Sequence, residues 1–134
     1  MGQQQLLLIV LGVIIVGIAV VVGINVFTAS STQANRDAVI ADMTNLASLA
    51  QQHYRKPSAL GGGNNAFNTA NGGTVWAIPG QLDTTGNGTY AATVAAQTVT
   101  IVGTGRETGN NGTSAVQATM VVGPNAITST TINN

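Results

Sequence analysis

The sequence predicts an α+β protein in which one long N-terminal helix is packed by a small antiparallel sheet of three to four strands. The stretch Leu6–Phe27 reads LLLIVLGVIIVGIAVVVGINVF, an apolar run without any charged residue. The C-terminal half is rich in Gly, Thr, Asn and Ser, and short β-branched runs alternate there with turn residues. We therefore expect two regions, a helix over residues 1–56 and a β-rich globular head over residues 57–134.

The apolar run is expected to be a helix because of its length. As a helix it would extend about 33 Å, enough to cross the roughly 30 Å hydrocarbon core of a bilayer. As a single strand it would span about 70 Å, well beyond ordinary strands, although the run is rich in Val and Ile. Exposing each large apolar side chain to water costs about 1.5–3 kcal/mol. We therefore expect residues 6–27 to lie in lipid or against copies of themselves.

The start of the chain does not have the pattern of a cleaved signal peptide. Such peptides begin with a cationic region and continue with an apolar run of about 7–15 residues. Here Gln3, Gln4 and Gln5 precede a longer run, and the first charge along the chain is Arg36. The apolar segment is therefore expected to be retained and functional.

Three glycines, Gly12, Gly17 and Gly23, interrupt the apolar run. In water each would weaken a helix by about 1 kcal/mol relative to alanine. Between packed helices, the missing side chain lets two backbones approach closely. Glycine is also common in membrane helices in general, so a packing role and simple membrane composition both stay open.

The helix is expected to continue from Thr28 as an amphipathic segment over residues 28–56. No proline interrupts it before Pro57, and charged positions such as Arg36 and Asp42 are expected away from its apolar stripe. Cations in the last turn and a proline just beyond are typical of a helix end, here near Arg55. The residues that form the stripe at helical spacing are Val39, Met43, Leu46 and Ala50.

The remainder is expected to form the sheet that covers this stripe. Residues 58–71 have the composition of a loop, and Gly103–Gly112 is expected to be a polar turn region. One face of a small antiparallel sheet would be apolar and would bury the helical stripe. The expected strands lie in Thr89–Val102, which holds one or two, in Ala115–Val122 and in Ala126–Ile132.

Composition excludes several classes of function. The net charge is zero and the chain has only four cations, too few for a nucleic-acid-binding patch. Cysteine is absent, which excludes a disulfide framework and thiolate metal sites. His53 is the only histidine and has no nucleophile and carboxylate at a catalytic spacing. We expect a protein that is not an enzyme and that needs no catalytic residue, metal or cofactor.

The layout of the chain resembles that of type IV pilins. Asn35–Lys56, which reads NRDAVIADMTNLASLAQQHYRK, is similar to the pilin helix where it leaves its apolar half and packs under the head. The likeness covers about the first 56 residues, whereas the sheet region matches only in architecture. Pilins usually carry a glutamate five residues into the mature chain, and Gln5 stands there if Met1 is the mature first residue. The disulfide-bounded loop of many pilins has no counterpart here.

This resemblance implies a structural subunit of an extracellular filament at the cell surface, built around a core of N-terminal helices. The implied partners are other copies of the chain, an inner-membrane pilus assembly machinery, and the lipid bilayer that holds a membrane-embedded pool before assembly. The residues expected to mediate self-assembly are Met1, Gln5, Leu6, Leu7, Ile9, Leu11, Gly12, Ile14, Ile15, Gly17, Ile18, Val21, Gly23 and Phe27.

Two rival interpretations stay open. The chain could be a single-pass membrane-anchored module that displays a small β-domain and remains monomeric, or a membrane oligomer with a pore lined by Asn25. The head is almost free of charge, which suits dense subunit contacts, a cover of glycans, or both. Two Asn-x-Thr sequons, at Asn87 and Asn111, are candidate glycosylation sites.

Overall fold

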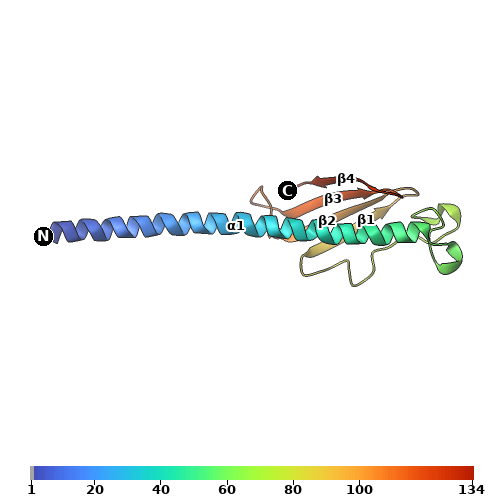
Figure 1. Ribbon diagram of the computed structural model, residues 1–134, viewed down its shortest axis with the longest axis horizontal. Coiled ribbons are helices and arrows are strands. Elements are labelled where there is room, and N and C mark those ends of the chain that lie inside the picture. The colour runs from blue at the N-terminus through green and yellow to red at the C-terminus, as the bar shows by residue number, and fades with distance from the viewer. Residues whose placement is uncertain (1) are drawn as a thin grey trace.

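The computed structural model describes residues 2–134 and shows one long helix beside a four-stranded antiparallel sheet (Figure 1). Each strand pairs with its neighbours in sequence, in the order β1-β2-β3-β4. The predicted α+β class is confirmed, with four strands in the sheet. The elements are the helix α1 (Gly2–Arg55) and the strands β1 (Gly88–Val94), β2 (Val99–Thr108), β3 (Ala115–Val122) and β4 (Ile127–Ile132).

The helix α1 is continuous over 54 residues and ends just before Pro57. Its last carbonyl groups, which have no partner within a helix, accept hydrogen bonds from the chain that follows. Gly63 N donates to His53 O at 2.8 Å, and Asn65 N donates to Tyr54 O at 2.8 Å. The loop therefore folds back onto the end of the helix instead of leaving it.

The long connection between α1 and β1 brings aromatic side chains to the core. It contains two short 3-10 helices, η1 (Ser58–Leu60) and η2 (Thr69–Asn71). Phe67 N donates to the main-chain oxygen of Ala96 at 3.0 Å, and Trp76 N donates to Phe67 O at 2.8 Å. These backbone bonds tie the connection to the end of the sheet and place Phe67 and Trp76 against the apolar cluster.

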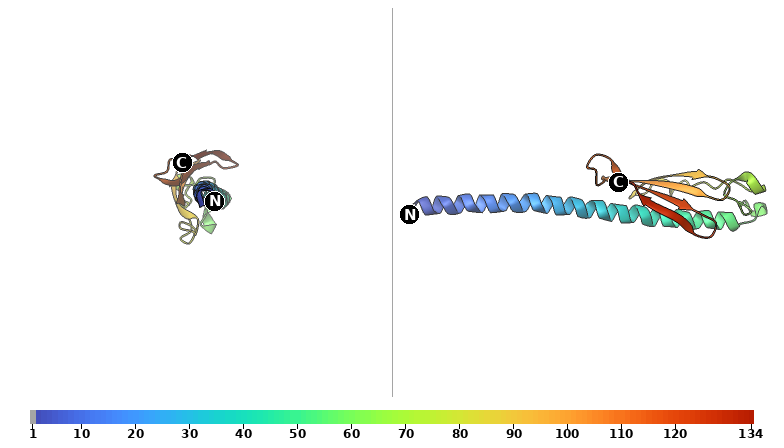
Figure 2. Two further views of the ribbon diagram at one scale, coloured as in Figure 1. Left: turned by 90° about the vertical axis from the view of Figure 1, so that its left-hand side faces the viewer. Right: turned by 90° about the horizontal axis from the view of Figure 1, so that it is seen from above.

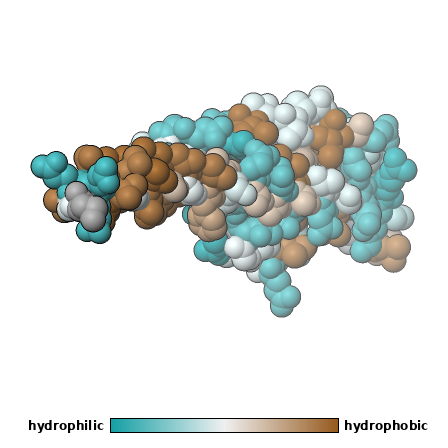
Figure 3. All heavy atoms as spheres, turned by 60° about the vertical axis from the view of Figure 1, so that its left-hand side comes forward, coloured by the Kyte–Doolittle hydropathy of each residue, from teal (hydrophilic) through white to brown (hydrophobic). Residues whose placement is uncertain are grey.

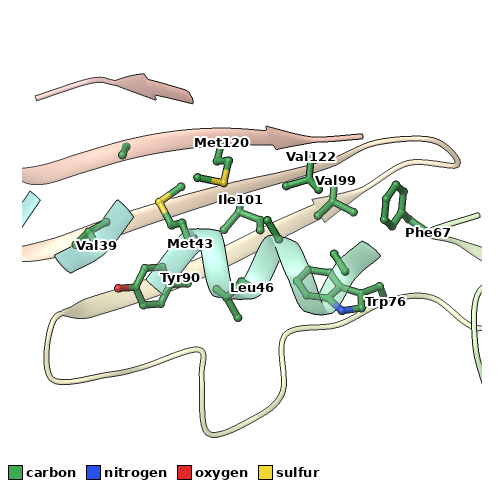
Figure 4. Packing of buried hydrophobic residues seen from close by; sticks show 13 residues of the cluster. Val39, Met43, Leu46, Phe67, Trp76, Tyr90, Val99, Ile101, Met120 and Val122 are labelled. Carbon is green, nitrogen blue, oxygen red and sulfur yellow. The ribbon is translucent and has the colours of Figure 1, made fainter. Parts of the chain in front are cut away.

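The core lies between α1 and the inner face of the two central strands, β2 and β3 (Figure 4). The four stripe residues of α1 are at most 1% exposed. Strand alternation explains their partners, because every second residue of β2 and β3 faces the helix. These partners are Val99, Ile101, Ala118, Met120 and Val122, with Phe67, Trp76 and Tyr90 closing the cluster.

Strand β2 corrects the prediction of a turn over residues 103–112, of which only residues 109–112 lie in the turn between β2 and β3. The strand continues to Thr108, and Gly103 and Gly105 lie within it on the helix-facing side. A Cβ atom at Gly103 would lie 2.8 Å from both Met43 Sδ and Val39 Cγ1. At Gly105 it would collide with Asn35 Oδ1. Glycine is present because α1 passes close to the sheet here, and not because the chain turns.

The head covers only the second half of α1 (Figures 1 and 2). The buried residues of the helix begin at Thr32, whose hydroxyl donates to Thr108 O at 2.9 Å. In the view along the helix axis the sheet lies to one side of α1 (Figure 2). From Gly2 to Ser30 every helical residue is exposed, and this half of α1 projects away from the head.

Candidate functional site

The N-terminal half of α1 is an apolar surface that nothing in the described chain covers. Its large side chains from Leu6 to Phe27 are each 53–75% exposed. The most apolar stretch of 18 residues has a mean hydropathy of 3.3, and none of it is buried. Figure 3 shows this half of the helix as a nearly unbroken hydrophobic surface with polar groups at its tip. We call residues 6–27 the apolar arm.

Water is an unfavourable environment for this arm. At about 1.5–3 kcal/mol for each large apolar side chain, its exposure costs tens of kcal/mol. By length and composition, α1 is able to cross a membrane. Soluble monomers rarely expose an apolar patch larger than a few hundred Å². The arm therefore needs a cover that the described chain does not supply, and lipid or other apolar helices would provide one.

The arm carries no charged side chain, and the first charged side chain after it points into the head. No charged side chain occurs before Arg36, and Arg36 is only 9% exposed. Its guanidinium is turned into the head, where Nη2 donates to Asn134 O at 3.2 Å and Nη1 donates to Gln33 Oε1 at 3.1 Å. Arg36 was predicted to lie off the buried stripe, which is wrong, because it precedes Val39 by three residues and shares its face.

The polar groups next to the arm are compatible with a dry environment. The hydroxyl of Thr28 donates to Ile24 O at 3.0 Å, so its hydrogen is bonded to the helix backbone and needs no water. The main-chain groups of residues 6–27 lie in the interior of α1 and are likewise paired along the helix. The arm can therefore exchange water for lipid or protein without leaving unpaired backbone groups.

The three glycines of the arm have no partner within the chain. A Cβ atom built at Gly12, Gly17 or Gly23 would find no atom within 4 Å. This differs from Gly103 and Gly105, whose small size is required by α1. Since glycine destabilises a helix interior by about 1 kcal/mol, the arm has three weakened positions that the isolated subunit does not need.

The residues predicted to mediate self-assembly share this exposed surface, with one exception. Met1 lies outside the described residues. The others are spread around all sides of the same uncovered helix, so they do not define a single interacting face. They are Gln5, Leu6, Leu7, Ile9, Leu11, Gly12, Ile14, Ile15, Gly17, Ile18, Val21, Gly23 and Phe27.

The two candidate glycosylation sites have different environments. Asn87 is half-buried, and its side-chain Nδ2 donates to Asp42 Oδ2 at 3.1 Å. Asn111 is exposed in the β2–β3 turn, where its Oδ1 accepts hydrogen bonds from Thr113 N and Ser114 N, each at 2.9 Å. A sugar on Asn87 would have to be attached to a nitrogen that is half-buried and bonded to Asp42, whereas Asn111 is exposed.

A polar cluster around Asp42 was not recognised in the sequence. Asp42 Oδ2 accepts hydrogen bonds from the hydroxyls of Tyr90 at 2.6 Å and Thr85 at 2.9 Å, in addition to the bond from Asn87. Partial burial opposes ionisation, but these three hydrogen bonds together lower the pKa of Asp42. Burial and the bond to Asp42 raise the pKa of Tyr90 well above its usual range. The cluster ties α1 to β1 and to the loop before it.

Because the pKa of Asp42 is lower in the folded head, the cluster adds a pH dependence to stability. The unfolded chain binds the proton first on acidification, so the contribution is present above about pH 4 and is lost as the pH falls through the folded pKa. We expect the free energy of unfolding of wild type to decrease between about pH 7 and about pH 3. Asp42→Asn should be less stable near neutrality and should lose less on acidification. Urea unfolding, followed by the fluorescence of Trp76, measures the free energy of unfolding of both proteins as a function of pH. An equal pH dependence in the two proteins would contradict the role of Asp42.

The remaining candidates for chemistry have structural surroundings. His53 Nε2 lies 2.7 Å from Thr74 O, at the point where the loop folds over the end of α1. Trp76 is 5% exposed in the core. Among residues 2–134 no group of three or more His, Asp or Glu side chains is arranged to hold a metal ion. The arm is therefore the feature of the described chain that most needs a functional explanation.

Comparisons with protein-family models, curated proteins and solved structures found no match to this chain. The interpretation of the arm and the head accordingly rests on their own geometry and chemistry.

Proposed function

We propose that this chain is a structural subunit of a type IV pilus-like extracellular filament. One observation carries the proposal: a fully exposed apolar arm continues without a break into the helix that forms the core of a folded head. A rigid arm of this kind places apolar surface at a fixed position relative to the head. Copies that bury their arms against one another would form a helical core surrounded by heads, with no catalytic role for any residue.

The proposed pathway uses the membrane as a reservoir. The arm is long enough to hold the unassembled subunit in a bilayer, and it has no charge that must be moved when the subunit leaves. Because an apolar helix is stable both in lipid and among other apolar helices, exchange between them needs little free energy. An assembly machinery in the inner membrane would drive the transfer, and the filament would extend from the cell surface.

The arm glycines support packing between helices over simple anchoring. Lipid adapts to any side chain and gains nothing from glycine, whereas a neighbouring helix can approach a glycine closely. The monomeric alternative, a single-pass anchor that displays the head, uses the same apolar arm. It provides no role for the weakened positions or for an α1 that remains continuous through residues 28–34.

Gly17→Leu tests this distinction. No atom lies within 4 Å of a Cβ at this position, so the isolated subunit should keep the stability of its head. In the filament the added side chain would separate neighbouring helices, and we expect assembly to be strongly reduced. Electron microscopy and sedimentation after detergent removal measure the assembled fraction.

Val16→Leu is the matched control, because Val16 is already a large and exposed residue, and this variant should assemble like wild type. A membrane-anchored monomer predicts that both variants behave alike. Full assembly of Gly17→Leu would therefore remove the packing role of this glycine.

A further inference from the structure

The outer edge of β4 is an unprotected strand edge. Within residues 2–134 nothing pairs with this edge, and β4 has the sequence ITSTTI, with neither charge nor proline. Asn133 N donates to Gln117 O of β3 at 2.8 Å, and the groups of successive residues alternate in direction. The N–H and C=O groups of Thr130 and Ile132 therefore point to the open side. Soluble proteins usually guard such edges with charges, proline or covering segments.

The opposite edge of the sheet is half covered. Along the first part of β1, Tyr90 N donates to Asp83 O at 2.8 Å and Thr85 N donates to Gly88 O at 2.9 Å. By the same alternation the main-chain groups of Ala92 and Val94 point outward, beyond the covered part. An open groove of about 480 Å³ lies along this free part of β1. Its lining includes Val75, Ile78, Ala92 and Val94.

Exposed apolar side chains of the head gather at these two margins. Besides Leu60, the large hydrophobic residues exposed in the described head are Val75 at 52%, Ile127 at 38% and Ile132 at 48%. Val75 lines the groove beside β1. Ile132 is opposite Ala118 and Ile127 is opposite Val122, so both share the helix-facing side of the sheet. They extend past the helix, which covers β2 and β3 but not β4.

We infer that β4 of one subunit pairs with the free part of β1 of the next subunit, so that the heads join into a continuous sheet. Strand direction is consistent with this pairing. In a four-stranded antiparallel meander β4 runs opposite to β1. In a filament whose subunits all point the same way, β4 also runs opposite to β1 of its neighbour. The two edges therefore meet as an antiparallel pair, like the neighbouring strands within each sheet.

The position of the margins fits the same arrangement. The strands run along α1, and the sheet lies to one side of it, with β1 and β4 at its two margins (Figures 1 and 2). With the helices in the centre of a filament and the sheets outside, these margins face neighbouring heads. Neither strand contains a charged residue, and the one charged residue that lines the groove, Asp83, lies beside the covered part of β1. The inference rests on the proposed filament and identifies its second interface.

Cysteine cross-linking of assembled full-length protein tests the inference. The chain has no cysteine of its own, so disulfides can form only between the introduced cysteines. Thr131 lies on the outer side of β4, and Ala91 and Thr93 lie on the same side of β1. Across the proposed contact, these would be non-hydrogen-bonded pairs, whose Cα atoms are about 4.5 Å apart, within reach of a disulfide. Thr131→Cys/Thr93→Cys tests the register that pairs Thr130 and Ile132 with Val94 and Ala92. Thr131→Cys/Ala91→Cys tests the register shifted by two residues, in which Thr130 is opposite Ala92.

We expect one double variant to give a covalent ladder of dimers, trimers and larger species when oxidised in the assembled state. Within one head the two positions are three strand spacings apart, about 14 Å, too far for an internal disulfide. Each single cysteine variant should remain without a ladder. All three positions are exposed, so folding should be retained, which the fluorescence of the buried Trp76 checks.

The outcomes separate the inference from the proposed function. Suppose that wild type forms filaments and that both double variants assemble when reduced but do not cross-link when oxidised. This result would overturn the joined sheet and leave the proposed filament standing. Efficient dimers of the single variant Thr131→Cys would replace it by a symmetric β4–β4 contact, which also overturns it. Absence of filaments in the wild-type preparation would overturn the proposed function, and the joined sheet with it.

Discussion

Deletion of residues 1–27 is expected to convert the chain into a soluble head that no longer polymerises. The deletion removes the whole apolar arm, whose exposure accounts for tens of kcal/mol of unfavourable hydration. The buried residues of α1 begin at Thr32, so the helical part of the core stays intact. Light scattering of the purified head should give the mass of a monomer, and Trp76 should keep the fluorescence of a buried indole.

The full chain is the control for this deletion. After detergent removal it should sediment or enter vesicles under the conditions in which the truncated head stays in solution. If the truncated head still formed fibres, contacts between heads alone would support assembly. The arm would then not be the core of the filament.

Leu46→Ala is expected to have the largest effect of any single apolar truncation on the stripe of α1. Leu46 is 1% exposed and lies between the sheet and the loop before β1 (Figure 4). Removing a buried leucine side chain costs about 2–5 kcal/mol, through lost transfer free energy and the cavity that remains. A domain of this size has about 5–15 kcal/mol of stability in total. Urea unfolding of the full chain in mild detergent measures the loss through Trp76.

Leu60→Ala is the matched control, because Leu60 is 67% exposed in η1. The same chemical change there should alter the free energy of unfolding by no more than about 0.5 kcal/mol. Equal effects of the two substitutions would contradict the assignment of the core to the junction of helix and sheet.

The long helix and most of the strands could be predicted because their signals are local. The length of the apolar run decides between helix and strand, and the spacing of Val39, Met43 and Leu46 fixes the face that the sheet covers. Strands β3 and β4 are short β-branched runs bounded by turn residues. Such patterns depend on the neighbours of a residue in sequence, and one sequence is enough to read them.

The end of β2 could not be predicted because its cause is tertiary. Gly103 and Gly105 have the composition of a turn, and only the close approach of α1 explains why glycine stands there in a strand. The burial of Arg36 and the cluster around Asp42 have the same origin. Their partners Asn134 and Tyr90 are distant in sequence, and the residues next to Arg36 and Asp42 do not indicate them.

The apolar arm was the part of the candidate site most accessible to sequence reasoning, since its hydrophobicity needs no tertiary information. The edges of β1 and β4 were not accessible in this way. Whether a strand lies at the margin of a sheet depends on the order of all four strands. Which half of β1 stays open depends on the backbone hydrogen bonds that β1 makes with Asp83 and Thr85.

Electron microscopy of the full-length protein after detergent removal tests the central claim most directly. The account predicts helical filaments whose density has α1 arms packed in the centre and heads outside, with neighbouring helices closest at Gly12, Gly17 and Gly23. With no lipid present to hold the arms, single subunits or aggregates that lack a central core of packed arms would contradict it.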